Sequence, residues 1–416
     1  MTDRALSPRT STRFADDSHP SGAAEKNPRM SSTSPSRFVL SPAVRARFGE
    51  RAERLGPRLF DGDPLADAAV AVMRPLAHHE RTAMVDRALR GGEGPVVDEL
   101  RALVRACVRL PFWVDFDRIN RGGSAFLRSG ILGGLVLGTY ALTASYCSPA
   151  GNKPLVLSGR LEEETPRRLA ETSRYVQLVS QRDALRPGRD GWIATVKVRL
   201  MHASVRAMAL ASPKWKREAW GTPINQADSA GTGLLFSWVV LDGLDKLGFG
   251  IEGEEREDLL HLWRYASYLL GVDEDLLWAT EREAKDLWEL LAATQDGPDE
   301  DSRRLAKALL ESGRKSARND IERARAERMV PVSYALSRYF IGDEMADALG
   351  MPRTGIERAL PLLKRVRTGA KLLARGLGAL PIGTADAGAR YWQFVVEQGL
   401  RGTPADFSMP AALRSA

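Results

Sequence analysis

Apolar residues recur at helical spacing along most of the chain from residue 38 onward, whereas the first 37 residues contain no apolar run. Positions three and four residues apart lie on one face of a helix, and runs of β-branched residues are scarce. The pattern therefore predicts an all-α protein, with further helices as far as about Gln398. The segments with the clearest pattern are 64–73, 95–110, 124–147, 166–180, 191–210, 226–248 and 254–270.

Residues that start or stop helices mark several of these boundaries. Thr165 followed by proline is typical of a helix N-terminus. Asn225 is the expected N-cap of the segment that follows it, with Asp228 three residues later as in a capping box. Gly271 is the expected stop of the 254–270 helix. That helix places its apolar face inward, and the residues on this face are Leu259, Leu262, Trp263, Ala266, Leu269 and Leu270.

The segment 129–152 carries no charged residue, and its apolar part runs from Ile131 to Cys147. This part is short for a membrane span, and three glycines interrupt it. We therefore expect a buried central helix. Its glycines, Gly133, Gly134 and Gly138, would allow another helix or a flat ligand to approach closely.

The length of 416 residues, with 44% hydrophobic residues, allows a large core. We expect a disordered tail over residues 1–37, one helical domain over 38–400 and a C-terminal tail over 401–416. Cys107 and Cys147 are the only cysteines, so neither a disulfide framework nor a structural zinc site is expected. No apolar signal-peptide core follows the arginines of the tail, and we expect a cytoplasmic protein.

The net charge of +7 is concentrated near the C-terminus, in residues 353–383. No aromatic-interleaved basic motif accompanies this charge, so nucleic acid is not an expected partner. A helix with a solvated basic face explains the segment, and peripheral contact with the inner face of a membrane is the alternative. The basic residues of this segment are Arg353, Arg358, Lys364, Arg365, Arg367, Lys371 and Arg375, against the one acid Glu357.

His202, one of five histidines, lies inside a long apolar helical pattern. On a helix, Val198 and Val205 flank it on one side, and Arg199 and Arg206 flank it on the other. This arrangement suits a haem, because the iron needs an axial nitrogen and apolar walls, and the propionates need cations. The alternative is a buried histidine that makes a hydrogen bond to the backbone.

Several ordered segments resemble the MpaB-type oxygenases, which include the latex-clearing (rubber) oxygenases. The resemblance covers about residues 60–380. The segments that carry it are Trp113-Val-Asp115, Ser158-Gly-Arg160-Leu, Arg168-Leu-Ala-Glu-Thr172, Val198-Arg-Leu-Met-His202, Pro223-Ile-Asn-Gln226, Leu241-Asp-Gly-Leu-Asp-Lys-Leu-Gly248, His261-Leu-Trp-Arg-Tyr265 and Leu269-Leu-Gly-Val272.

This resemblance implies a mostly helical domain that binds haem b, with its iron, through His202 as the one axial histidine. It places Arg168 and Thr172 in the haem pocket as catalytic residues. The implied reaction is the cleavage of an isoprenoid carbon–carbon double bond by dioxygen, which leaves two carbonyl ends. The rubber-cleaving branch has a catalytic acid sixteen residues before the arginine, and here that position is Asn152, which cannot act as a base. The expected substrate is an unsaturated hydrophobic small molecule or a polyprenyl chain.

Two other classes of protein stay open on the residues alone. His202, His261 and a carboxylate would suit a mononuclear non-haem iron enzyme, which needs a facial triad. Asp258 and His261 have the carboxylate-x-x-His spacing of di-iron bundles, but the second copy of that motif is missing, so we expect His261 to lie near the cofactor as a hydrogen-bonding residue. A non-catalytic helical protein could instead bind membranes or hydrophobic ligands through residues 353–383.

Overall fold

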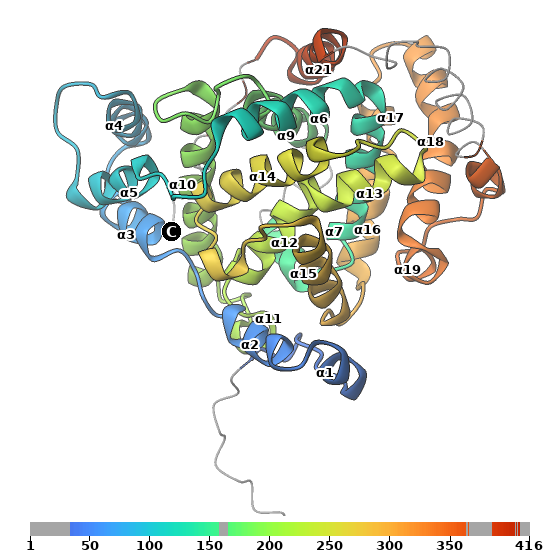
Figure 1. Ribbon diagram of the computed structural model, residues 1–416, viewed down its shortest axis with the longest axis horizontal. Coiled ribbons are helices and arrows are strands. Elements are labelled where there is room, and N and C mark those ends of the chain that lie inside the picture. Colours follow the sequence, from blue (N-terminus) through green and yellow to red (C-terminus); the bar gives the residue numbers. More distant parts are fainter. Residues whose placement is uncertain are drawn as a thin grey trace, which may run out of the picture. The chain divides into compact units, whose positions relative to one another are not determined.

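The computed structural model describes residues 34–157, 165–362, 365, 385–403, 405 and 407. Within these residues the chain is helical and has no strand, which confirms the predicted all-α class (Figure 1). The elements are α1 (Pro42–Phe48), α2 (Glu50–Arg58), α3 (Pro64–Met73), α4 (His78–Arg90), α5 (Asp98–Val108), α6 (Phe116–Val136), the π-helix η1 (Leu137–Ala141), α7 (Leu142–Ser145), α8 (Pro149–Leu157), α9 (Thr165–Val179), α10 (Asp190–Ala211), α11 (Arg217–Trp220), α12 (Gln226–Phe236), α13 (Trp238–Lys246), α14 (Glu254–Leu269), the 3₁₀ helix η2 (Glu274–Leu276), α15 (Glu281–Ala293), α16 (Glu300–Leu310), α17 (Ser312–Ser316), α18 (Asp320–Ile341), α19 (Asp343–Ala348), the 3₁₀ helix η3 (Ile356–Arg358) and α21 (Ala385–Leu400).

Helix α6 is the centre of the main core and packs along α14, α21 and α13 (Figure 1). Gly122 allows α14 to approach closely, because a Cβ at this position would lie 2.2 Å from the Asp258 carbonyl oxygen. The continuous helical stretch Phe116–Ser145 is long and apolar enough to span a membrane, but 56% of its apolar window is buried inside the protein. The predicted buried central helix is therefore present.

Two local deviations interrupt this stretch. Gly130 has φ 48° and ψ −125°, which divides α6 in two, and residues 137–141 form the π-helix η1. Of the glycines expected to allow close approach, Gly134 does so for α21, since a Cβ there would lie 2.7 Å from the Tyr391 hydroxyl. Gly138 faces open space, so its lack of a side chain serves no close contact.

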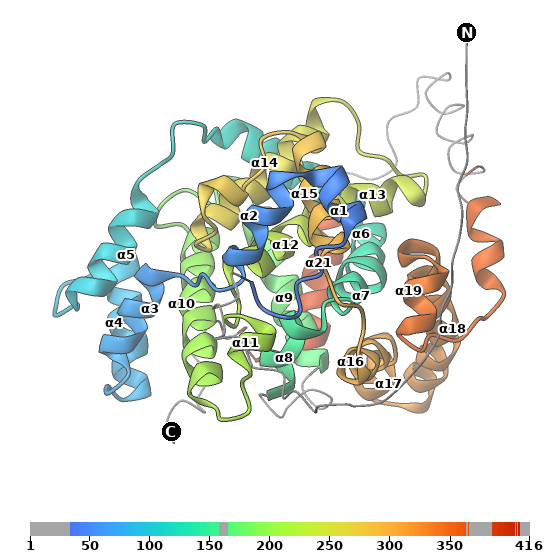
Figure 2. The ribbon, with the colours of Figure 1, turned by 90° about the horizontal axis from the view of Figure 1, so that it is seen from below.

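Helices α9 and α10 form a hairpin that connects two parts of the fold. Both views show α10 between the group formed by α3, α4 and α5 and the helices around α6 (Figures 1 and 2). The hydroxyls of Tyr175 on α9 and Thr195 on α10 are hydrogen-bonded at 3.2 Å, and both residues are buried. This contact fixes how the two helices face each other.

The predicted helix over 226–248 is two helices, α12 and α13. Ser237 has φ −115° and ψ −87°, and its hydroxyl donates to the Gly233 carbonyl, so the break follows from backbone geometry that hydrophobic spacing does not encode. Asn225 is the N-cap of α12, as predicted, and accepts a hydrogen bond from the Asp228 N–H at 2.9 Å. The predicted capping box is wrong, because the Asp228 carboxylate binds the side chains of Asn225 and Arg37 instead.

Residues 34–37 pack onto the helices, although the sequence places them in a tail. Ser36 and Arg37 donate backbone hydrogen bonds to the carbonyls of Glu218 and Ala219, and the Arg37 side chain is 4% exposed. The rest of the predicted N-terminal tail lies outside the described residues. So do most of the basic segment 353–383 and most of the predicted C-terminal tail 401–416.

Candidate functional site

His202 lies deep within the protein and still keeps accessible surface, so its side chain borders a space rather than close-packed atoms. Burial and then the neighbouring Arg206 cation lower the pKa of His202 to about 4, and the imidazole is neutral at pH 7. Neither ring nitrogen has a hydrogen-bond partner among the described residues. A neutral imidazole with an unused nitrogen beside an internal space has the chemistry of a metal ligand.

Arg168 and Thr172 lie on the helix that faces His202. Arg168 precedes Tyr175 by seven residues, and His202 follows Thr195 by seven, so each is about 10 Å along its helix from the Tyr175–Thr195 hydrogen bond and on the same face. Because consecutive helices of a hairpin run in opposite directions, both displacements lead the same way. Both residues therefore lie on the side of the hydrogen bond away from the connecting turn, and Thr172 lies about one turn closer to it than Arg168 does. The charges that act on His202 are those of Arg206 and Asp63.

The side chains of Arg168 and Thr172 are also chemically available. Both are partly buried, and neither has a hydrogen bond or ion pair within the part of the chain that the structure describes. Arg168 is close enough to Tyr146 for its charge to oppose the burial that raises the pKa of this phenol. Helix α9, which packs against α10, thus carries one cation and one hydroxyl without a hydrogen-bond partner among the described residues.

Arg199 and Arg206 bind carboxylates of the α3 segment. The Arg199 guanidinium makes two hydrogen bonds to Asp63, at 2.7 and 2.9 Å, and Arg206 Nε lies 2.8 Å from Asp67. Arg206 also donates to the Ile224 carbonyl at 2.8 Å. These contacts give both arginines structural partners that join α3 to α10, so the geometry does not assign them to haem propionates.

His261 is held in a different part of the fold. Its Nε2 accepts a hydrogen bond from the Asp115 N–H at 3.1 Å, next to the edge of the Trp113 ring. Burial, followed by the charges of Arg118 and Arg264, lowers the pKa of His261 to about 4. The hydrogen bond ties α14 to the start of α6, and the structure does not bring His261 into the space between α9 and α10.

Asn152 lies at the position where the family resemblance predicts a catalytic acid, and its side chain acts as a hydrogen-bond donor. Its amide nitrogen donates to the carbonyls of Ser145 and Ser148, at 3.0 and 2.7 Å, and the side chain is buried. A carboxylate here would face two carbonyl oxygens and be repelled by both. An acid, Asp228, borders the adjacent residue Gly151 with its carboxyl group. The sequence pattern treated Asp228 as a capping residue, and only long-range packing reveals this position.

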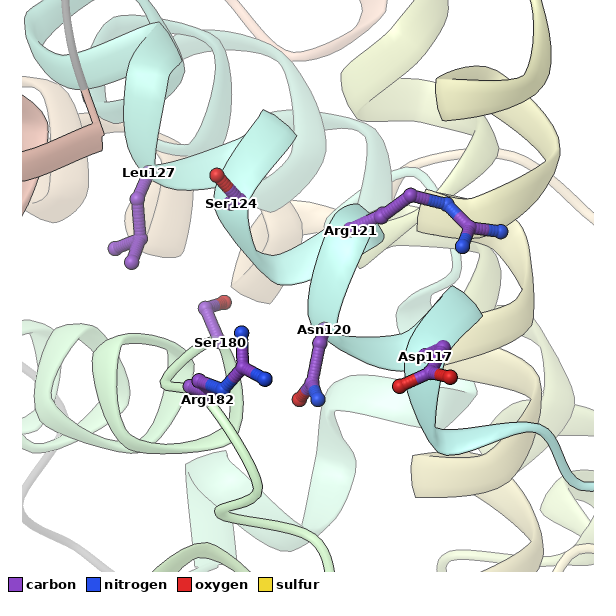
Figure 3. A pocket seen from close by; sticks show the side chains of 7 residues that line it. All are labelled: Asp117, Asn120, Arg121, Ser124, Leu127, Ser180 and Arg182. Atoms are coloured by element: carbon purple, nitrogen blue, oxygen red, sulfur yellow. The ribbon is translucent and has the colours of Figure 1, made fainter.

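A second hollow, of about 510 Å³, opens at the surface between α6 and the turn after α9 (Figure 3). Its lining is mostly polar and includes Asn120, Ser124, Ser180 and Arg182, while Arg121 turns away to bind Asp258 on α14. None of the predicted site residues lines it.

Among the described residues, no group of three or more His, Cys, Asp or Glu side chains is arranged to hold a metal ion. The facial triad that a non-haem iron site at His202 and His261 would need is therefore not supported by the described part of the chain. Cys107 and Cys147 are both unpaired, as predicted.

The chain was compared with known proteins and structures. A family model described as "ER-bound oxygenase mpaB/B'/Rubber oxygenase, catalytic domain" matches residues 127–375, more than half of the chain. A rubber oxygenase from Streptomyces sp. (strain K30) is 27% identical over 296 residues, which cover 68% of this chain and 69% of the relative. A structure of latex clearing protein LCP in the closed state shares the fold, with a TM-score of 0.63 at 23% identity over 83% of this chain and 90% of that chain.

These matches define the class of protein as an oxidoreductase with an all-helical fold. The chain belongs to the family of MpaB and rubber oxygenases, as its sequence motifs predict. The family match includes α8, α9 and α10, which carry Asn152, Arg168, Thr172 and His202.

Proposed function

We propose that this protein is a haem b-dependent oxygenase that uses dioxygen to cleave a carbon–carbon double bond of an unsaturated, isoprenoid-like hydrophobic molecule. The observation that carries the proposal is the neutral imidazole of His202, which has no hydrogen bond among the described residues and lies on the helix that packs against α9. Membership of an oxygenase family and the match to a rubber oxygenase support it.

The residues present fit the iron-ligand position of a haem. His202 supplies one neutral nitrogen beside an internal space, and the buried Val198 next to it contributes an apolar wall. A haem bound at His202 would supply the iron at which dioxygen is activated. Arg199 and Arg206 are paired with Asp63 and Asp67, so this proposal assigns them to the support of α10 and not to the propionates.

In this proposal each of the other residues has one task. The Thr172 hydroxyl donates a hydrogen bond to oxygen, and the Arg168 guanidinium stabilises negative charge that develops as oxygen is reduced. The apolar surroundings exclude water and hold the alkene. Asn152 takes no proton, because an amide is not a base at neutral pH, and its amide hydrogens are donated to backbone carbonyls.

The proposal is tested by the ultraviolet–visible spectrum of the purified protein, expressed with haem supplied. We expect a Soret band in the wild type that is lost or strongly shifted in His202→Ala. His261→Gln is the matched control and should keep the band, because its amide oxygen can still accept the hydrogen bond from Asp115. Circular dichroism confirms that each variant is folded.

A folded wild type without a Soret band would overturn the haem assignment. A band that survives in His202→Ala would show that another residue holds the iron. Loss of bound iron in both His202→Ala and His261→Gln, without a Soret band in the wild type, would instead favour the non-haem class.

A further inference from the structure

A separate chamber of about 330 Å³ lies where η1, α7, α8, α12, α15 and the end of α18 meet. Most of its wall is apolar and includes Ala144, Leu235, Trp288, Leu291 and Phe340. Gly231 helps to keep it open, since a Cβ there would touch only Leu291, at 3.6 Å. The volume and the apolar lining are those of a small-molecule site, at the lower end of the usual range of sizes.

The polar side chains on the wall have already donated their hydrogens to the protein. The amide hydrogens of Asn152 go to two backbone carbonyls, and the Ser148 hydroxyl donates to Gln295 Oε1. The hydroxyls of Ser145 and Thr232 donate to carbonyls of their own helices. Among the described lining side chains, the free donors are one amide hydrogen of Gln295 and the indole N–H of Trp288, and the other polar groups offer acceptors.

Asp228 provides the strongest of these acceptors. Its Oδ2 accepts hydrogen bonds from Arg37 and Asn225, both at 2.7 Å. Its Oδ1 has no partner in the described part of the chain, and a Cβ on Gly151 would lie 3.6 Å from it. The carboxylate is thus held by one oxygen and leaves the other free at the wall of the chamber. Asn152 also lines the chamber, and its Oδ1 has no hydrogen bond among the described residues.

We propose that this chamber binds a small apolar molecule that carries a hydroxyl group, which donates a hydrogen bond to Asp228 Oδ1 with Asn152 Oδ1 as a second acceptor. An apolar body fills the space between Leu235, Leu291 and Phe340. A carboxylic acid is rejected, because its anion meets a carboxylate and no free cation. An ether or a carbonyl compound of the same size is disfavoured, because it has no hydrogen to donate.

This inference rests on the proposed function and narrows its substrate to an unsaturated alcohol of terpenoid size. Helix α8 lines the chamber through Asn152 and also contacts α10, which carries His202. The chamber therefore lies one helix away from α10, and none of its described lining residues is on α9 or α10. Binding in the chamber can be measured without turnover, so the two proposals are tested separately.

Isothermal titration calorimetry of the full-length protein with geraniol, geranyl methyl ether and geranic acid tests the proposal. We expect geraniol to bind at least about tenfold more tightly than either of the other two, because only geraniol can donate a hydrogen bond to the Asp228 carboxylate without adding a second negative charge. Asp228→Asn should weaken the binding of geraniol about tenfold or more and reduce the discrimination against geranic acid.

Asp228→Asn removes the charge that pairs with Arg37 and can destabilise the fold. Two glycine variants therefore test the chamber without changing this ion pair. Gly231→Leu fills the chamber from α12 and should abolish binding, while Gly313→Leu makes the same change at an exposed position of α17 and should not. Equal affinity for the three probes, or geraniol binding that survives Gly231→Leu, would overturn the proposal. If the wild type prefers geraniol but shows no Soret band, the proposed binding in the chamber is supported and the haem assignment is refuted.

Discussion

A histidine can bind iron only through a neutral nitrogen, and His202 meets this condition before any cofactor arrives. Burial and Arg206 keep its proton affinity low, and no other group takes up the ring nitrogens within the described residues. Of the two neighbouring arginines, Arg206 lowers the pKa of His202, while Asp63, the partner of Arg199, raises it. Arg199 and Arg206 are fixed by Asp63 and Asp67, which holds positive charge near His202 without competing for its lone pair.

The proposal assigns iron binding to His202 and the chemistry of oxygen to Arg168 and Thr172. Arg168→Ala and Thr172→Val should keep the Soret band, because neither residue is the iron ligand, and each should slow alkene-dependent oxygen consumption by about 100-fold. Oxygen-electrode rates on haem-loaded protein measure this. Arg168→Lys should recover only part of the rate, since a compact ammonium replaces the planar guanidinium.

The matched control for these two variants is Arg167→Ala. Arg167 lies on the same helix but is exposed and paired with Glu171, one residue away from the face that meets α10. Its rate should stay near that of the wild type. Unchanged rates in Arg168→Ala and Thr172→Val would show that neither residue takes part in oxygen chemistry.

Among the elements, helices with a clear start signal were the most predictable. Asp63 followed by Pro64 defines α3 at the predicted residues 64–73, because the carboxylate accepts the Ala66 N–H and proline suits the first turn. The break at Ser237 was not predictable in this way, since apolar residues continue through it. The kink at Gly130 is likewise a property of backbone angles rather than of hydrophobic spacing.

Gly130 gives a prediction for the central helix. Its φ of 48° with ψ of −125° is a conformation that side chains other than glycine rarely adopt, so Gly130→Ala should reduce the free energy of unfolding by about 1–3 kcal/mol. Chemical denaturation monitored by circular dichroism measures the change. Gly138→Ala is the control and should be neutral or slightly stabilising, because a Cβ there meets nothing within 4 Å. An equal effect of both changes would refute the role of the backbone angle.

For the whole molecule, the sequence predicted the family and the helical class, but not the pairing of charges across helices. The spacing of apolar residues showed that His202 lies within an apolar helix. The partners of Arg199 and Arg206 could not be predicted, because Asp63 and Asp67 lie more than 130 residues away in the sequence. The same holds for Arg37 and Asp228, which are 191 residues apart. Such pairs depend on the assembled fold, and local patterns do not determine them.

Acid should weaken the whole fold through its buried histidines. The pKa of His261 is about 4 in the folded state and near 6.5 when unfolded, so between these values the unfolded state binds more protons and stability falls as the pH drops. From pH 7 to pH 5 this loss is about 2 kcal/mol for His261. Thermal unfolding at both pH values should show a smaller loss for His261→Gln than for the wild type.

The control for this experiment is His79→Gln, which changes an exposed histidine at the start of α4. It should lose stability on acidification as the wild type does. If His261→Gln lost as much stability as the wild type between pH 7 and pH 5, the buried neutral state of His261 would be contradicted.

Because residues 34–37 pack onto the helices, proteolysis at Arg37 measures how often this N-terminal segment detaches. Trypsin cleaves after arginine only when the side chain can enter the protease pocket, and the Arg37 side chain is 4% exposed while it holds Asp228. Cleavage at this bond therefore requires a local opening of the N-terminal segment. The same opening breaks the hydrogen bond from Arg37 to Asp228. The rate of cleavage after Arg37 would therefore measure how often the Asp228 carboxylate loses this partner. A molecule that binds in the chamber and stabilises Asp228 would slow the cleavage.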